Sequence, residues 1–220
     1  HYPLRRQRQM CIRDRDTLIL FSSDNGPQGS WGGNAYPDDL KLTDFNQPLP
    51  MRGKKTDVYE GGMHVPGFAV WPGHIEPRQV GSAVHIIDWF PTLARLIGYE
   101  PSQPLDWDGV DIGKQMFGDA TATDRAADRE LYWLWSASSS RWALRHGRWK
   151  IVRYGKGDPK DANAWQLFDL DTDPMEEHNV AKQHSDVLQA MYARFLVQRS
   201  KDKVQRKKGK KGKKGKGGKR

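Results

Sequence analysis

The sequence predicts an α/β fold in which two short apolar strands and a helix precede a small antiparallel region. Three observations support this fold class. An apolar run at 17–21 stops at a cluster of turn residues, a second run at 67–72 follows a glycine-rich loop, and a helical pattern occupies 90–97. Short apolar runs bounded by turn residues are typical of strands, and a helix of this length can cover a sheet.

The first strand ends at Ser22-Ser23-Asp24-Asn25-Gly26, and this junction is the strongest indication of function in the chain. We expect a buried strand of a parallel sheet here, and open α/β sheets place ligand sites at the carboxyl ends of such strands. Asp24 offers a charged oxygen and Asn25 a neutral one, the hard donors that Ca²⁺ and Mg²⁺ prefer, while Gly26 lets the backbone turn. The junction predicts part of a metal site, although Asp-Asn-Gly is also a common turn sequence.

Two residues bound the predicted helix, because Pro91 fits a helix start and Gly98 fits a helix end. This helix should cover the sheet. Asp88 fits a helix cap better than a catalytic acid, and His85, in an apolar stretch, fits a packed core histidine. The stretch 101–128, with prolines at its start and many acidic residues, is expected to be a linker on the surface.

The remainder of the folded region is predicted to be antiparallel. Apolar and aromatic runs at 130–135, 141–154 and 165–170 predict three or four strands, with a hairpin turn at His146-Gly147. A final helix is expected over about 185–198. One face of that helix would carry Val187, Leu188, Met191, Phe195 and Leu196.

The acidic residues after the last predicted strand invite a metal-site interpretation. Asp169, Asp171 and Asp173 alternate as in a calcium-binding loop, but the distal Gly and Glu of such a loop are missing. We therefore expect a capped turn. The histidines beyond residue 140 lack the spacing of a zinc site.

Charge divides the chain into three parts. Residues 1–15 carry a net charge of +4 and residues 201–220 a net +11, so the total of +9 leaves −6 for residues 16–200. The high pI therefore does not indicate a nucleic-acid-binding domain, and nucleic acid is not expected as a native partner. The Lys/Gly-rich tail should be disordered. It is either a solubilising extension or a salt-sensitive tether to polyanions such as sulfated polysaccharide.

The first fifteen residues show neither strand alternation nor an apolar helical face, and we expect a non-native or disordered leader. Cys11 is the only cysteine, so no disulfide framework indicates a cellular compartment. No stretch is long and apolar enough to span a membrane, and no signal peptide is visible.

An ordered series of motifs runs from about residue 16 to residue 200, and the order is far more specific than any one motif. The series comprises Ser23-Asp24-Asn25-Gly26, Lys55 with Glu60-Gly61-Gly62, Val65-Pro66, Trp71-Pro72-Gly73, Asp88-Trp89-Phe90-Pro91-Thr92-Leu93, Asp108-Gly109-Val110-Asp111, Arg148-Trp149-Lys150 and Leu167-Phe168-Asp169-Leu170-Asp171-Thr172-Asp173-Pro174. With this series the chain resembles the sulfatase family, most closely the arylsulfatase type, within the alkaline-phosphatase-like superfamily.

The resemblance implies a division of the chain. Residues 16–128 would form the C-terminal part of the sulfatase catalytic α/β domain, and residues 129–200 a small C-terminal subdomain of antiparallel sheet plus helix. The leader 1–15 and the tail 201–220 would lie outside both.

The resemblance also implies roles for individual residues. Asp24 and Asn25 match two ligands of the active-site divalent cation, usually Ca²⁺, with Mg²⁺ as the alternative. Lys55, five residues before the Glu-Gly-Gly motif, matches the catalytic lysine that contacts the substrate sulfate, and the adjacent Lys54 is its rival. His64 stands where an arginine is common and is a candidate for substrate binding. A cation and an ammonium group would stabilise the charge that builds up during sulfate ester hydrolysis.

The nucleophile of the family is a formylglycine made from Cys in a Cys-x-Pro/Ala-Ser-Arg motif. Cys11 lies in Cys11-Ile12-Arg13-Asp14-Arg15, which lacks that pattern. We therefore expect a C-terminal fragment of a sulfatase for aryl or carbohydrate sulfate esters, with its formylglycine on a missing N-terminal part and no activity alone. The family suggests a periplasmic or secreted location.

Two alternatives remain open at this point. The first is a phosphodiesterase or phosphonate hydrolase of the same superfamily. The second is a non-catalytic module that binds polyanions through its basic tail.

Overall fold

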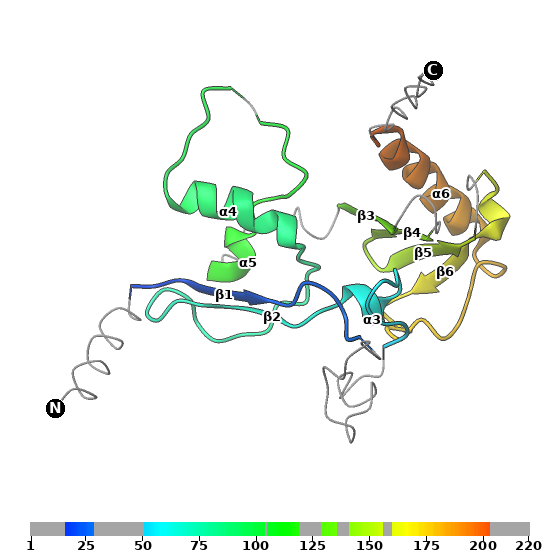
Figure 1. Cartoon of the computed structure of the whole chain (residues 1–220), viewed down its shortest axis with the longest axis horizontal. Helices are drawn as coiled ribbons and strands as arrows, with labels where there is room; N and C mark the ends of the chain where they lie inside the picture. The colour runs from blue at the N-terminus through cyan, green and yellow to red at the C-terminus, as the bar shows by residue number, and fades with distance from the viewer. Residues whose placement is uncertain are drawn as a thin grey trace, which may run out of the picture.

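The computed structural model describes residues 16–28, 51–103, 105–118, 129–135, 141–155 and 160–202. It contains a two-stranded sheet and a four-stranded sheet, with short helices between them (Figure 1). The predicted leader and nearly all of the predicted tail lie outside the described residues. No helix in the described ranges is long and apolar enough to cross a membrane.

The two-stranded sheet pairs β1 (Ile19–Ser22) with β2 (Gly67–Val70) in antiparallel register. The prediction of a buried strand in a parallel sheet is therefore wrong for this pair. The antiparallel pairing continues beyond the strands, where Ser23 N–H donates to Pro66 O at 3.3 Å. A parallel pair would instead need a crossover along the sheet face. The side chains of β1 are also largely exposed, and an apolar run by itself does not specify what covers it.

The predicted helix is confirmed as α4 (Trp89–Leu96), and Gly98 follows it at a φ of +69°, a left-handed conformation that suits glycine. In Figure 1, α4 and α5 (Gly113–Phe117) lie on the same side of the β1–β2 pair. Ile112, just before α5, is buried and donates its N–H to the buried hydroxyl of Thr92. The stretch predicted as a surface linker therefore contains a packed helix.

Asp88 has a structural role, as predicted, but a different one from capping α4. Its buried carboxylate accepts the N–H groups of His85 at 2.6 Å and Val110 at 3.1 Å, and it pairs with the Arg129 guanidinium. The carboxylate thus caps the 3₁₀ turn formed by Ile86–Asp88 and joins it to distant parts of the chain.

The four-stranded sheet confirms the antiparallel prediction. β3 (Glu130–Trp135), β4 (Arg141–His146), β5 (Trp149–Tyr154) and β6 (Gln166–Asp169) are hydrogen-bonded in chain order. Gly147, at a φ of +56°, forms the tight turn between β4 and β5. The hairpin register follows from this turn, with His146 opposite Trp149.

The core of this region forms where α6 (Ser185–Ser200) packs on the four-stranded sheet (Figure 1). Leu188, Met191 and Phe195 are buried, as the helical pattern predicts, but Leu196 is 46% exposed and does not belong to this face. The three buried residues follow the three- and four-residue spacing of a single helix face, and Leu196 is rotated away from it. Together with them the cluster contains Trp142, Leu144, Ile151, Trp165 and Leu167.

The described structure continues two residues past the predicted boundary at 200. Tyr132 donates its hydroxyl to the Asp202 carboxylate at 2.9 Å. Packing of the helix end against β3 therefore includes the first residues of the predicted tail.

Candidate active site

Backbone hydrogen bonds bring together the two segments that hold the predicted site residues. Gly26 N–H donates to Gly62 O at 3.0 Å, and Lys55 N–H donates to Pro27 O at 2.9 Å. The turn after β1 is therefore fixed against the loop that carries Lys55. Two segments separated by about thirty residues form one local unit.

Glycines make this close approach possible. A Cβ at Gly26 would lie 1.8 Å from the carbonyl oxygen of Gly61, and a Cβ at Gly61 would lie 2.5 Å from that of Arg52. Neither clash can be relieved by moving a side chain, because the neighbouring atoms belong to the backbone. Any larger residue would force the turn after β1 and the Lys55 loop apart.

The two predicted metal ligands offer oxygen donors. Asp24 is exposed, and within the described ranges no other group pairs with its carboxylate. Asn25 donates its side-chain amide N–H to Gly26 O at 2.9 Å, which leaves Oδ1 as an acceptor. A carboxylate and an amide oxygen suit Ca²⁺ or Mg²⁺, but Ca²⁺ takes roughly six to eight oxygen ligands. This pair fits part of such a site and would need further ligands.

Lys55 and its rival Lys54 differ in their surroundings. Lys55 is partly buried and Lys54 is exposed. The next residue, Thr56, has a φ of +79°, which is uncommon for a threonine and marks a sharply constrained turn. The backbone direction thus changes abruptly after Lys55, and groups outside the loop must hold this conformation in place.

Side chains from the four-stranded sheet supply that support. Arg141 on β4 donates to Thr56 O at 2.7 Å and to the Asp57 carboxylate at 3.0 Å. Tyr154 on β5 donates its hydroxyl to the same carboxylate at 3.1 Å, and its ring stacks on Tyr59 with centroids 5.0 Å apart. The Lys55 loop is therefore held from two strands of the small sheet.

A buried ionic network forms the deepest contact between the loop and the small sheet. The Lys150 ammonium on β5 lies 2.7 Å from Glu60 Oε1 and 3.0 Å from Glu176 Oε1, and Glu60 N–H donates to Glu176 Oε2 at 2.5 Å. Lys150 and Glu176 are fully buried, and Glu60 is 5% exposed. Glu60 opens the short helix α3 (Glu60–Met63).

The pKa values of the two carboxyl groups in the network are shifted in opposite directions. Burial would raise the pKa of Glu60, but the nearby Lys150 ammonium, helped by His64 and Arg145, brings that pKa down to about 2. For Glu176, burial is the strongest influence and raises the pKa above its usual range, despite the attraction of Lys150. Lys150 therefore stabilises the ionised form of Glu60 more effectively than it stabilises that of Glu176.

His64 lies at the end of α3. Its Nδ1 is 3.3 Å from Glu60 Oε2, its backbone N–H donates to Glu60 O at 2.7 Å, and its side chain is 58% exposed. The structure therefore ties His64 to the same glutamate while leaving much of its ring open to solvent.

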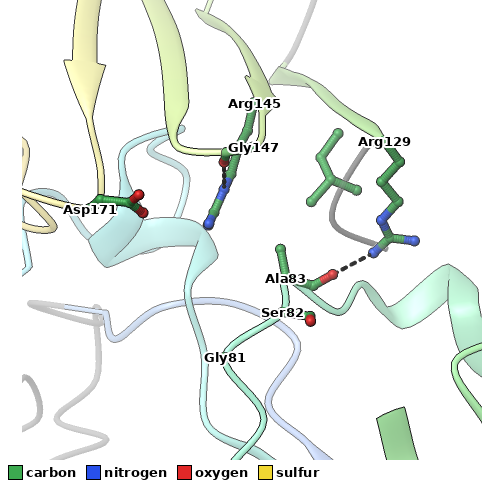
Figure 2. Close-up of a pocket in the computed structure, with 8 residues that line it drawn as sticks. Gly81, Ser82, Ala83, Arg129, Arg145, Gly147 and Asp171 are labelled. Atoms are coloured by element: carbon green, nitrogen blue, oxygen red, sulfur yellow. Dashed lines mark hydrogen bonds between the residues drawn. The ribbon is translucent and has the colours of Figure 1, made fainter. Parts of the chain in front are cut away.

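A pocket of about 380 Å³ is lined by Gly81, Ser82, Ala83, Arg129, Leu131, Arg145, Gly147 and Asp171 (Figure 2). Arg145 lines it, donates from Nε to Gly147 O at 3.1 Å, and has a terminal nitrogen 3.9 Å from Glu60 Oε2. Arg129 lies across the pocket and donates to Ala83 O at 3.0 Å. Both guanidinium groups thus serve internal contacts, and neither is directed only at the cavity.

The structure also groups Asp173, Glu177 and His178, whose ligand atoms lie within 4.8 Å of one another. The Asp173 carboxylate, however, accepts the N–H groups of Glu177 at 3.0 Å and His178 at 2.8 Å. The predicted capped turn before Pro174 is confirmed by other contacts, in which Asp169 Oδ1 accepts the N–H of Asp171 at 3.3 Å and Asp169 O accepts the N–H of Asp173 at 2.8 Å.

Comparison with known proteins identifies the family. The family described as N-sulphoglucosamine sulphohydrolase, C-terminal, matches residues 53–202, which is more than half of the chain. The chain belongs to the sulfatase family. The match begins just before Lys55 and includes Glu60, Lys150 and Glu176.

Relatives of known function are also sulfatases. The chain is 31% identical over 193 residues to N-acetylgalactosamine-6-O-sulfatase of Bacteroides thetaiotaomicron, a match covering 80% of this chain and 35% of that protein. It is 29% identical over 199 residues to human arylsulfatase A, covering 80% of this chain and 36% of that protein. This sulfatase chain therefore spans about a third of the length of these curated relatives.

Solved structures confirm the fold. Ps i-CgsB matches with a TM-score of 0.66 at 25% identity, covering 89% of this chain and 39% of that one. A Bacteroides thetaiotaomicron sulfatase structure from work on the metabolism of multiple glycosaminoglycans matches with a TM-score of 0.65 at 22% identity. The match covers 90% of this chain and 42% of that chain. The predicted fold class, the C-terminal part of a sulfatase fold with a small antiparallel sheet and helix, is thus confirmed.

Sequence reasoning missed most of the residues that support the Lys55 loop. One sequence feature indicated the role of Lys150: a charged residue within the strand Trp149–Tyr154 needs a partner if it is buried. No sequence feature indicated the role of Glu176, because its contact with Glu60 N–H joins positions 116 residues apart. The roles of Arg141 and Tyr154 likewise depend on strand pairing, which brings them to the loop from a distant part of the chain.

Proposed function

We propose that this chain is the C-terminal part of a metal-dependent sulfatase and contributes Asp24, Asn25 and Lys55 to the active site. The observation that carries the proposal is the backbone junction in which Gly26 bonds to Gly62 and Lys55 bonds to Pro27. This junction holds the two oxygen donors and the lysine within one local unit. Family membership supplies the reaction class, hydrolysis of a sulfate ester.

Each residue has a distinct role in this proposal. A divalent cation, Ca²⁺ or Mg²⁺, held in part by Asp24 and Asn25, would supply positive charge beside the sulfate oxygens. Lys55 would donate to a sulfate oxygen and stabilise the negative charge that grows in the transition state. His64, with its open ring edge, would contact the substrate.

The nucleophile would come from a segment outside this chain, a formylglycine in the proposed complete enzyme. Binding groups without a covalent nucleophile do not provide the two-step chemistry of the family. The chain alone should therefore turn over no sulfate ester, and catalysis would require the complete enzyme, in a periplasmic or secreted setting.

Carbohydrate sulfates are the substrate class that the relatives favour. One relative is named an N-acetylgalactosamine-6-O-sulfatase. A matching solved structure, at 25% identity and a TM-score of 0.64, holds Ps i-CgsB in complex with k-i-k-neocarrahexaose. Aryl sulfates remain suitable assay substrates, because arylsulfatases are also among the relatives.

The test is a comparison of ester chemistries in the complete enzyme that contains this chain. Turnover of 4-nitrophenyl sulfate and of bis(4-nitrophenyl) phosphate would be measured with Ca²⁺, with Mg²⁺ and after chelation. We expect kcat/KM to be far higher for the sulfate and to fall on chelation. A preference for the phosphate diester would replace the proposal with phosphodiesterase activity, and metal-independent sulfate hydrolysis would overturn the metal role.

A further inference from the structure

The buried network of Lys150, Glu60 and Glu176 links the small sheet to the Lys55 loop. Lys150 comes from β5, Glu60 opens α3, and Glu176 follows β6. Glu60 is held twice, by its side chain through Lys150 and by its backbone N–H through Glu176. Such double attachment fixes both the position and the direction of the helix that Glu60 begins.

The network also reaches the Lys55 loop from its other end. Arg52 donates to Glu176 O at 3.0 Å, and Gly61 N–H donates to Arg52 O at 2.7 Å. Gly62, the next residue of α3, accepts the N–H of Gly26. Displacing Glu60 would therefore disturb the Lys55 loop and the turn after β1 together.

Folding stability alone gives little reason to bury these charges. Removing an ion pair from water costs several kcal/mol per ion, and apolar residues of similar volume are often equally stable or more stable at such sites. A hydrogen-bonded ionic network, in contrast, sets atomic positions more narrowly than apolar packing does. Here the fixed positions are those of α3 and the predicted site segments.

We propose that Lys150 and Glu176 are positioning residues that hold Glu60, and through it the Lys55 loop and the Asp24–Asn25 turn, in the geometry for catalysis. The catalytic meaning of this inference rests on the proposed sulfatase function. The structural part of the inference does not depend on that function, because it concerns hydrogen bonds within the chain itself. Neither side chain is proposed to touch substrate.

The central variant is the double substitution K150M/E176M, which leaves the net charge unchanged and replaces two buried ionic groups with apolar ones. Glu60 loses its Lys150 partner but keeps Arg145 Nη1 at 3.9 Å and His64 Nδ1 at 3.3 Å from Oε2. The control is R148M, which removes an exposed ion pair with Asp169 two residues from Lys150. The single variant K150M, which leaves both carboxyl groups without their ammonium, should be much less stable than the double variant.

The readout in the chain is amide hydrogen exchange by NMR. In K150M/E176M, the amides of Gly26, Lys55 and Gly61 should exchange at least about tenfold faster, because each reports a hydrogen bond of the joined segments. Amides of the β4–β5 ladder should keep wild-type rates, as should all of these amides in R148M. Uniformly faster exchange would show a purely stabilising role, and unchanged exchange at the three amides would show no positioning; either result overturns the inference.

Kinetics of the complete enzyme then test the catalytic part. K150M/E176M should lower kcat on 4-nitrophenyl sulfate by about tenfold or more, with a smaller change in KM, while R148M stays near wild type. Unchanged kcat would contradict the positioning role. If instead Lys55→Ala has no effect on sulfate turnover while the exchange result holds, the proposed function fails and the structural linkage survives.

Discussion

Asp24 is the residue on which the metal proposal depends most directly. Its carboxylate is exposed and has no partner within the described ranges, whereas the carboxylates of Asp57, Asp88 and Asp169 are engaged by arginines. An unengaged carboxylate beside an amide oxygen is available to a cation. The residue type and the turn were predictable from the sequence, but the availability of the carboxylate was visible only in the structure.

Asp24→Ala in the complete enzyme should weaken Ca²⁺ affinity by about tenfold or more and lower activity in parallel, because it deletes a charged ligand. Isothermal titration of the metal-free enzyme measures the affinity, and activity during a calcium titration tests for partial rescue. Asp171→Ala, another exposed aspartate, is the matched control and should leave both unchanged. Undiminished Ca²⁺ affinity in the folded Asp24 variant would remove this residue from the metal site.

Glu176 makes a testable contribution to the pH dependence of folding. Because burial raises its pKa above the ordinary 4.5, its stabilising effect is present below pH 4.5 and is lost as pH rises through the folded-state pKa. Glu60 behaves oppositely: its effect is present above pH 4.5 and is lost as pH falls toward its pKa of about 2. The network should therefore be most stabilising near pH 4.5.

The measurement is the thermal midpoint of wild type, Glu176→Gln and Glu177→Gln from pH 3 to pH 8. The advantage of wild type over Glu176→Gln should shrink as pH rises above about 4.5. Glu177 is the neighbouring exposed glutamate, and its variant should follow wild type throughout. A wild-type advantage that grows with pH would mean that the Glu176 pKa is lowered and the assignment is reversed.

At the scale of elements, the strands and helices of the small sheet were the most predictable part of the chain. Apolar and aromatic runs, a glycine turn and a three- to four-residue helix spacing are local patterns, and they correspond to β3 to β6, the β4–β5 turn and α6. The direction of β1 was not predictable in the same way. Its apolar run, 17–21, indicates a strand but carries no information about its partner, which lies more than forty residues later in β2.

The packing of α6 gives a direct test at this scale. Phe195 is fully buried in the core and contacts Trp165 with ring centroids 4.4 Å apart, whereas Leu196 is 46% exposed. Phe195→Ala should lower the free energy of unfolding by about 3–5 kcal/mol. Leu196→Ala should change it by less than about 1 kcal/mol. Urea denaturation followed by far-UV circular dichroism measures both, and equal losses would show that the helix face has been assigned incorrectly.

At the scale of the whole molecule, the four-stranded sheet has two structural roles. It forms a hydrophobic core with α6, and it supports the Lys55 loop through Arg141, Tyr154 and Lys150. The candidate site residues could be proposed from the sequence because their motifs are contiguous. The residues that support them were not predictable, because their contacts join positions that are 84 to 124 residues apart in the sequence.

The most direct test of the account is kcat/KM on 4-nitrophenyl sulfate for Lys55→Ala and Lys54→Ala in the complete enzyme. Lys55→Ala should lower kcat/KM by a factor of about 10²–10³, because it removes a preorganised cationic contact to the sulfate group. Lys54→Ala, an adjacent and more exposed lysine, should remain near wild type. Normal kinetics for a folded Lys55→Ala enzyme, with the loss appearing in Lys54→Ala, would contradict the proposed contact between Lys55 and the sulfate group.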